Sequence, residues 1–157
     1  MAVSSYPHAK PAPSYNFVVY IDELQIPFSK VSSIEISIET EAFLEGGENL
    51  HVHSLSKPYS AEKTLTFERS VDTRGEGALE KTLGNSSLRV GACFKSIIIS
   101  VLDRHGKPQK AYVAFNAILK KRSLSDLNAM SGEVFVESME FIYEDLTEIP
   151  GVSAMFK

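Results

Sequence analysis

Apolar and polar residues alternate along residues 31–41, whose sequence is V-S-S-I-E-I-S-I-E-T-E. A period of two places Ile34, Ile36 and Ile38 on one face of an extended strand, whereas a helix would scatter them around its circumference. The opposite face carries carboxylates and hydroxyls. We therefore expect one long strand over these residues, with its isoleucine face buried and its acidic face in contact with water.

Aromatic and β-branched residues, which favour strands, recur in six more segments of the chain. The segments are residues 15–21, 26–29, 61–71, 90–102, 109–119 and 133–146. The sequence D-R-H-G-K-P predicts a hairpin turn between the fourth and fifth of them. Residues 43–59 form an unusually long connection with a Gly-Gly pair, and residues 120–126 are expected to be a basic, polar loop.

One short helix is expected, over residues 78–83. Thr73 and Glu76 match the capping-box pattern, and Leu79 and Leu83 lie one helical turn apart. About seven strands and one short α-helix make the chain mainly β, with the architecture of an antiparallel β-sandwich or barrel. Half-polar strands of this length leave sheet edges open, a problem that such chains solve by closure or by assembly.

The length fits a single domain with flanking segments. We expect a flexible N-terminal arm over residues 1–14, which hold three prolines, a β domain over residues 15–148 and a C-terminal tail over residues 149–157. No apolar run approaches the ~20 residues of a membrane span, and the N-terminus lacks the apolar core of a secretory signal. The single cysteine, Cys93, excludes an intrachain disulfide and is expected to be a small buried side chain.

Candidate metal chemistry is confined to two histidines. His51 and His53 share a strand face, but only Glu48 stands near them as a third ligand. Two partly exposed loop histidines are therefore the favoured interpretation over a metal site. No motif for a nucleophile, a phosphate loop or a dinucleotide is present. No cofactor and no metal is expected.

The formal net charge of −4 argues against non-specific attraction to nucleic acid. Glu35, Glu39 and Glu41 could serve as paired carboxylates, but catalytic pairs usually face each other across a cleft from different elements. We therefore favour a shared electrostatic lining and expect no enzyme activity. The basic run at residues 120–122 is interpreted as a solvated loop or, alternatively, as an interface patch for acidic neighbours.

Several segments resemble, in their order and spacing, those of a known family. Residues 28–35 (F-S-K-V-S-S-I-E) resemble the pattern F-S-x-V-S-G-L-E, and residues 45–49 (E-G-G-E-N) resemble an R-E-G-G-x-N loop. The match continues through residues 65–69, 99–108, 114–117, 127–134 and 137–146. The family is that of the T4-like tail tube proteins of contractile phage tails and their relatives, the inner tube proteins of extracellular contractile injection systems. Ser33 and Ser70 stand where the family patterns have glycine.

The resemblance implies a tail-tube fold in which six subunits form a ring and the rings stack into a hollow tube inside a contractile sheath. Each subunit would give four long strands to a hexameric inner β-barrel. The implied lumen-lining residues are Glu35, Ser37, Glu39 and Glu41. The implied ring-stacking loop is Glu45, Gly46, Gly47, Glu48 and Asn49, and the candidate basic interface patch is Lys120, Lys121 and Arg122.

The implied partners are further copies of the chain, the sheath protein, and baseplate, tube-initiator and terminator proteins. DNA or effector cargo would pass through the acidic lumen without specific binding. The same resemblance implies assembly in the bacterial cytoplasm and a final place in a virion tail or an extracellular injection particle, with no membrane anchor. A tube-initiating ring protein and a secreted ring that carries effectors are the alternatives, and an enzyme is less favoured.

Overall fold

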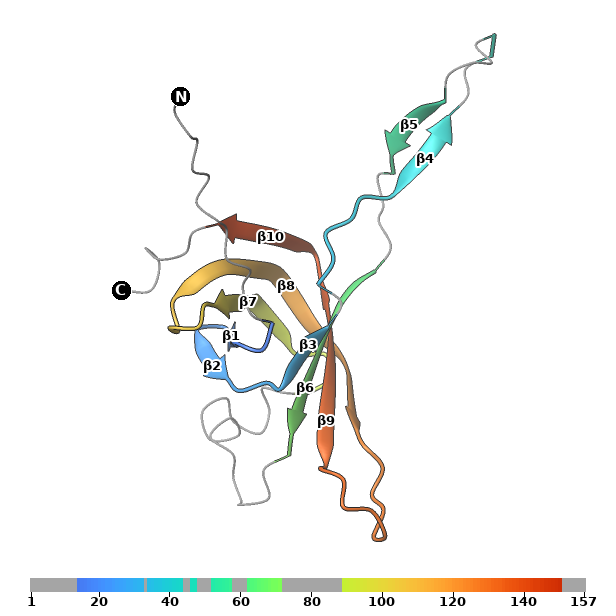
Figure 1. Ribbon diagram of the computed structural model, residues 1–157. Helices are drawn as coiled ribbons and strands as arrows, with labels where there is room; N and C mark the ends of the chain where they lie inside the picture. The colour runs from blue at the N-terminus through green and yellow to red at the C-terminus, as the bar shows by residue number, and fades with distance from the viewer. Residues whose placement is uncertain are drawn as a thin grey trace, which may run out of the picture.

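The computed structural model of the chain describes residues 14–32, 34–43, 46–47, 52–57, 62–71 and 89–150 (Figure 1). Every regular element in this part is a strand, so the predicted mainly β, antiparallel fold is confirmed. The predicted helix at residues 78–83 lies outside the described residues. So do residues 1–13, His51, residues 151–157, and Glu45, Glu48 and Asn49 of the predicted loop.

Eight of the ten strands form one antiparallel sheet. Its order is β2-β1-β7-β8-β9-β6-β3, with β10 pairing with β8 outside this path, while β4 and β5 form a separate hairpin. The bounds are β1 (Phe17–Ile21), β2 (Leu24–Ile26), β3 (Lys30–Ser32), β4 (Thr40–Phe43), β5 (His53–Ser56), β6 (Lys63–Ser70), β7 (Cys93–Leu102), β8 (Pro108–Leu124), β9 (Val136–Tyr143) and β10 (Asp145–Pro150).

The longest strand, β8, is bent and belongs to two parts of the sheet. Its first half pairs with β10, where Phe115 lies opposite Asp145, and its second half pairs with β9, where Ile118 lies opposite Ile142. Between the two halves Asn116 has a φ of 52°, a left-handed conformation that asparagine tolerates well. Its side-chain amide donates to Glu144 Oε2 at 2.5 Å, and Glu144 is the residue that separates β9 from β10. The two strands therefore bend at the same step.

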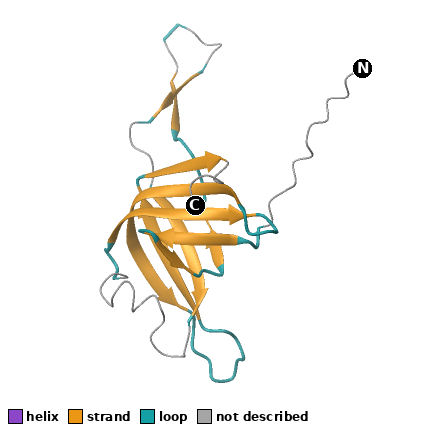
Figure 2. Cartoon of the chain, turned by 90° about the vertical axis from the view of Figure 1, so that its left-hand side faces the viewer, coloured by secondary structure: helices purple, strands orange, loops and turns teal. Residues whose placement is uncertain are grey.

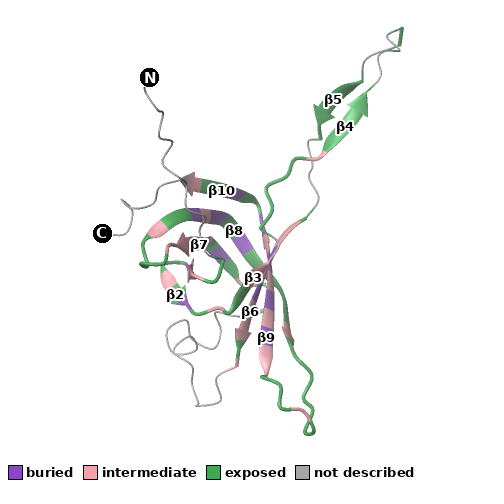
Figure 3. Cartoon of the chain, viewed as in Figure 1, coloured by how far each residue is buried: buried purple, intermediate pink, exposed green. Residues whose placement is uncertain are grey.

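The buried residues of this curved sheet form one hydrophobic core, and Figure 3 colours them along the strands of the body. Leu65, Phe67 and Phe141 are completely buried, and the rings of Phe67 and Phe141 meet edge to face with centroids 5.5 Å apart. Alternate residues of β6 and β9 contribute these side chains, as their period of two predicts. The prediction that Leu65 and Phe67 face inward is confirmed.

Four predicted segments are wrong in their extent. Residues 26–29 are not one strand, because β2 ends at Ile26 and β3 begins at Lys30, and residues 133–146 hold parts of two strands, β9 and β10. Residues 31–41 are not one strand, because β3 ends at Ser32, β4 begins at Thr40, and residues 34–39 belong to no strand. The predicted basic loop over residues 120–126 is wrong in its first part, because β8 continues through Leu124. Hydrogen bonding to β9 outweighs the low strand propensity of the lysines there.

Two smaller differences concern the ends of elements. Cys93 was expected to be buried but is exposed, because it opens β7 on the side opposite Phe94, which is buried. The last strand, β10, runs to Pro150, two residues beyond the predicted end of the β domain at Glu148.

The molecule has two projections at opposite ends. The hairpin of β4 and β5, hereafter the projecting hairpin, leaves the body at one end (Figure 1). The connection between β8 and β9 leaves it at the other end, as the view turned by 90° also shows (Figure 2). All eight residues of the two hairpin strands are exposed, whereas the sheet of the body encloses the core.

Candidate assembly surfaces

Four strands of the sheet have one face on the core and the other in water. They follow in the order β8-β9-β6-β3. Phe67 of β6 lies opposite Met139 of β9 on the core face, and Thr66 lies opposite Glu140 on the outer face. On that outer face the ammonium of Lys30 is 3.1 Å from Glu68 Oε1. This outer face is polar and carries charges of both signs.

The extended segment, residues 34–39, leaves β3 and runs to the projecting hairpin. It holds Glu35, Ser37 and Glu39 of the predicted lumen lining, of which Glu35 and Ser37 are exposed. Lys57 Nζ lies 3.9 Å from Glu39 Oε2. Glu41, the fourth predicted lining residue, lies in β4 opposite Leu55.

The isoleucines of the extended segment do not have the buried face that the sequence predicts. Ile34 is 39% exposed, Ile36 58% and Ile38 75%. Among the described residues, the one backbone–backbone hydrogen bond of this segment joins Lys57 N to Glu39 O at 2.9 Å, and Ile36 and Ile38 are largely uncovered. The sequence of the segment does alternate with a period of two. Its isoleucine face is nevertheless largely exposed in the described structure of the single chain.

One hydrogen bond ties the extended segment to the body. The phenol of Tyr143, at the end of β9, donates to the carbonyl oxygen of Glu35 at 2.9 Å. Burial raises the pKa of Tyr143, and the negative charges of Glu35 and Asp145 add to the effect. Tyr143 therefore remains a neutral donor at neutral pH and fixes where the segment departs from the sheet.

The projecting hairpin presents apolar side chains to water. Phe43 is 50% exposed and Leu55 57%. At its tip, Gly46 and Gly47 are both exposed, and Gly47 has a φ of +109°. A side chain at Gly47 would be strained in this left-handed region even though the space around it is open. The other predicted residues of the stacking loop lie outside the described part of the chain.

The basic run, Lys120, Lys121 and Arg122, lies in the second half of β8 and not in a loop. A bulge between Leu119 and Lys121 interrupts the register with β9. Lys120 pairs with Glu62, and this hydrogen bond raises the pKa of the Lys120 ammonium. The side chain of Lys121 has no hydrogen bond or ion pair among the residues that the structure describes.

The third member of the run, Arg122, belongs to a buried ion cluster. Glu137 is 1% exposed and lies between two guanidinium groups. Arg69 Nε donates to Glu137 Oε2 at 2.6 Å, and Arg122 Nε donates to Glu137 Oε1. The sequence analysis missed this cluster. The alternation along β9 could have revealed it. Glu137 lies two residues before Met139 and four before Phe141, so it faces the core with them.

The comparisons with known proteins decide the family. The sequence matches the family described as T4-like virus tail tube protein gp19 over residues 13–147. The chain belongs to the tail tube protein family. It is therefore a structural tube protein, and the predicted resemblance is confirmed.

Solved structures show the same fold. One is the tube-terminating cap of the anti-feeding prophage, with 21% identity, a TM-score of 0.77, and coverage of 96% of this chain and 100% of that one. A chain of the PVC sheath–tube complex in the extended state has 20% identity, a TM-score of 0.76, and coverage of 96% and 99%. Hcp1 from Salmonella typhimurium has 17% identity, a TM-score of 0.50, and coverage of 87% of each chain. No curated protein sequence matches the chain.

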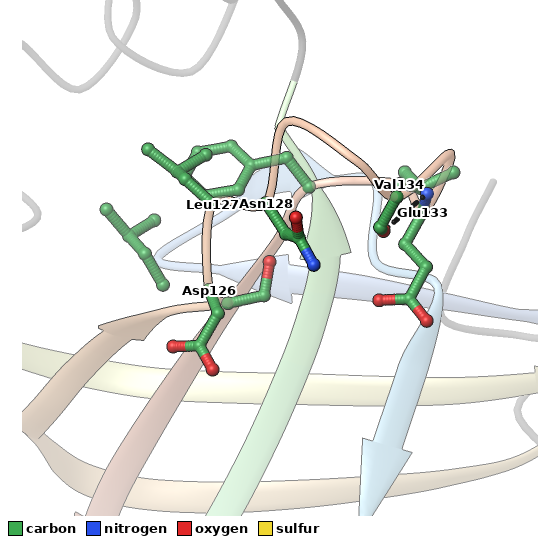
Figure 4. A pocket seen from close by; sticks show the side chains of 9 residues that line it. Asp126, Leu127, Asn128, Glu133 and Val134 are labelled. Carbon is green, nitrogen blue, oxygen red and sulfur yellow. Dashed lines mark hydrogen bonds between the residues drawn. The ribbon is translucent and has the colours of Figure 1, made fainter.

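This member of the tail tube family also has a cavity at the β8–β9 connection. Its volume is about 490 Å³, and it is lined by residues 124–128, Ser131 and residues 133–135 (Figure 4). Leu127 and Val134 of this lining are 83% and 68% exposed. The carboxylates of Asp126 and Glu133 lie at its rim (Figure 4). It is partly open to solvent.

The described residues show no group of three potential metal ligands, and His53 lies on exposed β5. Within the described part of this tail tube protein, no helix has the length and apolar character needed to cross a membrane.

Proposed function

We propose that this chain is a subunit of the inner tube of a contractile phage tail or of a phage-tail-like injection system. Six copies form a ring, and the rings stack into a hollow tube. DNA or effector cargo moves through the lumen without specific binding. The observation that carries this proposal is the four-stranded layer β8-β9-β6-β3, together with membership of the tail tube family.

The four strands of this layer alternate in direction, because every neighbouring pair is antiparallel. With an even number of strands, β3 at one edge runs antiparallel to β8 at the other. Copies related by rotation can therefore join edge to edge and keep the antiparallel pattern throughout the ring. A closed ring of strands leaves no exposed sheet edge.

The outer face of the layer is the proposed wall of the lumen. It faces away from the core and carries Thr66, Glu68 and Glu140. Glu35, Ser37, Glu39 and Glu41 are proposed to extend this wall toward the projecting hairpin. With a net charge of −4 per subunit, such a lumen repels the phosphates of DNA, so that cargo slides without sticking.

Ring stacking is proposed to use the projecting hairpin. It leaves the body at one end, and both of its strands are exposed (Figure 3). Phe43 and Leu55 are about half exposed in the single chain. Contact between opposite ends of successive copies is heterologous, so it generates an open stack and not a closed dimer. Gly47 at the tip, with Gly46 and the neighbouring Glu45, Glu48 and Asn49, is the proposed contact with the next ring.

The remaining partners are proposed from the relatives. Structures of this fold come from a sheath–tube complex, a tube-terminating cap and a baseplate. A sheath protein, a baseplate or initiator protein and a terminator are accordingly proposed to bind this tube. Assembly in the bacterial cytoplasm and function in a virion tail or an extracellular particle are part of the same proposal. No catalytic role is proposed.

Electron microscopy of the purified full-length chain tests the proposal. Negative-stain images and sedimentation velocity over a range of concentrations should show rings or rods with an open centre. Compact monomers under every condition would contradict it. Rings that never elongate, even when sheared tube fragments are added as seeds, would support the alternatives of a tube-initiating ring or a secreted effector carrier.

A further inference from the structure

One line of bent residues crosses the curved sheet. On β8 the line passes through Asn116, whose φ is 52°, and on β7 it passes through Lys95, which is level with Asn116 in the register. The pairing of β7 with β8 continues on both sides of these two residues but omits them. On the far side of β8 the line reaches Glu144, between β9 and β10. Lys95, Asn116 and Glu144 are hereafter the bend line, which marks the border between the layer β8-β9-β6-β3 and the rest of the sheet (Figure 1).

The direction of the side chains shows that each strand turns at the bend line. In an unbent strand, residues three apart point to opposite faces of the sheet. Here residues three apart, one on each side of the line, are buried in the same core at all three crossings: Phe94 and Ile97, Ala114 and Ala117, and Tyr143 and Leu146. The chain therefore shifts its alternation by one residue at each crossing, so that two parts of the sheet face one core from different directions.

Polar groups hold the bend line at each crossing. The carboxylate of Asp22, in the turn between β1 and β2, accepts the backbone N–H groups of residues 95 and 96 at 2.8 and 3.1 Å. The side-chain amide of Asn116 donates to Glu144 Oε2 at 2.5 Å, and Glu144 N donates to the carbonyl oxygen of Phe115 at 3.1 Å. Asp22, Asn116 and Glu144 are exposed, so their side chains add nothing to the buried core. Their hydrogen bonds instead fix the angle at which the strands turn.

The angle at the bend line decides how copies fit into the proposed ring. The layer β8-β9-β6-β3 would supply the wall, and the strands beyond the line, which include β1, β7 and β10, would lie outside it. Copies in a ring of six are rotated by about 60° from one to the next, and closure requires the same rotation at every contact. A wider or narrower bend changes the space that the outer part of each copy occupies between its two neighbours. A different number of copies then closes the ring, or the ring does not close.

Asn116 has the two properties that its position in the bend line needs. Asparagine tolerates the left-handed conformation, and its amide can donate to a carboxylate. Aspartate would keep the first property and lose the second, because its carboxylate would face that of Glu144. We infer that Asn116 and Glu144 are positioning residues that set the number of copies in the ring by fixing the bend. This inference rests on the proposed ring and concerns its size.

Exchange of the two partners tests the inference. Asn116→Asp places a second carboxylate beside Glu144 and should change the bend, whereas Asn116→Asp combined with Glu144→Gln restores an amide–carboxylate pair in reversed order. We expect the original chain to form rings of one rotational symmetry, counted in end-on views by electron microscopy. In Asn116→Asp the ratio of that symmetry to all others should fall about tenfold or more, because the lost hydrogen bond recurs in every copy. The double variant should regain one symmetry.

Two further variants separate the bend from general stability. Asn116→Gly keeps the left-handed conformation and removes only the amide, so rings of mixed symmetry are expected while circular dichroism shows an unchanged folded fraction. Glu148→Ala removes the side-chain contact with Lys110, which joins β10 to β8 at 2.6 Å away from the bend line. This matched control should leave the ring symmetry unchanged.

The outcomes separate this inference from the proposed function. If the original chain forms no rings, the proposed function fails. If it forms rings whose symmetry is unchanged in Asn116→Asp or in Asn116→Gly, the ring stands and the role of the bend line is overturned. Mixed symmetry that the double variant does not repair, or that Glu148→Ala also shows, would overturn it as well. Should Asn116→Asp lose its folded spectrum, Asn116→Gly alone decides.

Discussion

β6 and the extended segment carry the same alternating pattern but have opposite surroundings. Leu65 and Phe67 of β6 are completely buried, whereas Ile36 and Ile38 of the extended segment are 58% and 75% exposed. β6 lies between β9 and β3 in the sheet, while no described strand lies beside the segment. The comparison shows that alternation predicts a strand with two faces but does not say which molecule covers the apolar one.

This difference divides the molecule into a body that buries its own apolar side chains and a projection whose apolar side chains are exposed in the single chain. The body encloses the aromatic cluster of Phe67, Phe94 and Phe141. The projection offers a row of exposed apolar side chains, a feature that marks interaction surfaces. Substitutions in the two regions should therefore affect different measurements.

The largest expected effect is in the core of the body. Phe141→Ala should lower the free energy of unfolding by about 3–5 kcal/mol, because it removes a completely buried ring and leaves a cavity. The matched change Ile38→Ala in the extended segment should alter the stability of the monomer by less than about 0.5 kcal/mol but weaken assembly. Urea unfolding followed by circular dichroism measures both. A loss above 2 kcal/mol in Ile38→Ala would contradict the division.

The next effect compares a buried ion cluster with an exposed ion pair. Glu137→Gln keeps the shape of the side chain but leaves Arg69 and Arg122 without their counter-charge, so we expect a loss of about 2–3 kcal/mol, less than for a fully buried pair. Glu148→Gln removes the exposed partner of Lys110 and should change stability by less than about 1 kcal/mol. Thermal unfolding of both variants should show the large shift in Glu137→Gln alone.

The smallest effect concerns the hydrogen bond that joins the two regions. Tyr143→Phe removes the donor to Glu35 and should cost about 0.5–1.5 kcal/mol at pH 7. Because the pKa of Tyr143 is raised above its usual 10.0, the folded state favours the neutral phenol. Its contribution is complete below pH 10.0 and is lost as the pH rises through the raised pKa.

The alkaline part of this prediction has its own measurement. Melting temperatures between neutral pH and values above pH 10.0 should fall more steeply for the original chain than for Tyr143→Phe. Since the two proteins differ only at residue 143, the difference between the two curves isolates Tyr143. Parallel curves would show that folding does not favour the neutral form of Tyr143.

Much of the body could be predicted from the sequence because its strands cover their own faces. Residues 15–21 and 61–71 were predicted as strands and contain β1 and β6. The turn at residues 103–108 joins β7 and β8 as expected, with the Asp103 carboxylate accepting the backbone N–H of His105 and Lys107. In these segments local propensity and burial agree.

The remaining features depend on partners that lie far away in the sequence. Lys120 and Lys121 suggest a loop by composition, but pairing with β9 places them in a strand. The bend at Asn116 depends on Glu144, and the burial of Glu137 depends on Arg69. Of the candidate site, the acidic alternation at residues 34–39 could be predicted, whereas its uncovered isoleucine face could not, because that depends on which strands pair with it.

The unbroken course of β8 has a mechanical consequence. The strand spans Pro108–Leu124. Its first half is hydrogen-bonded to β10 and its second half to β9. Hydrogen bonds in such ladders stand perpendicular to the strands, so a force along β8 loads many of them in shear at the same time. A thrust delivered to the wall of a tube would thus pass into the body of each subunit through a continuous backbone, whose bend at Asn116 is held by the hydrogen bond to Glu144.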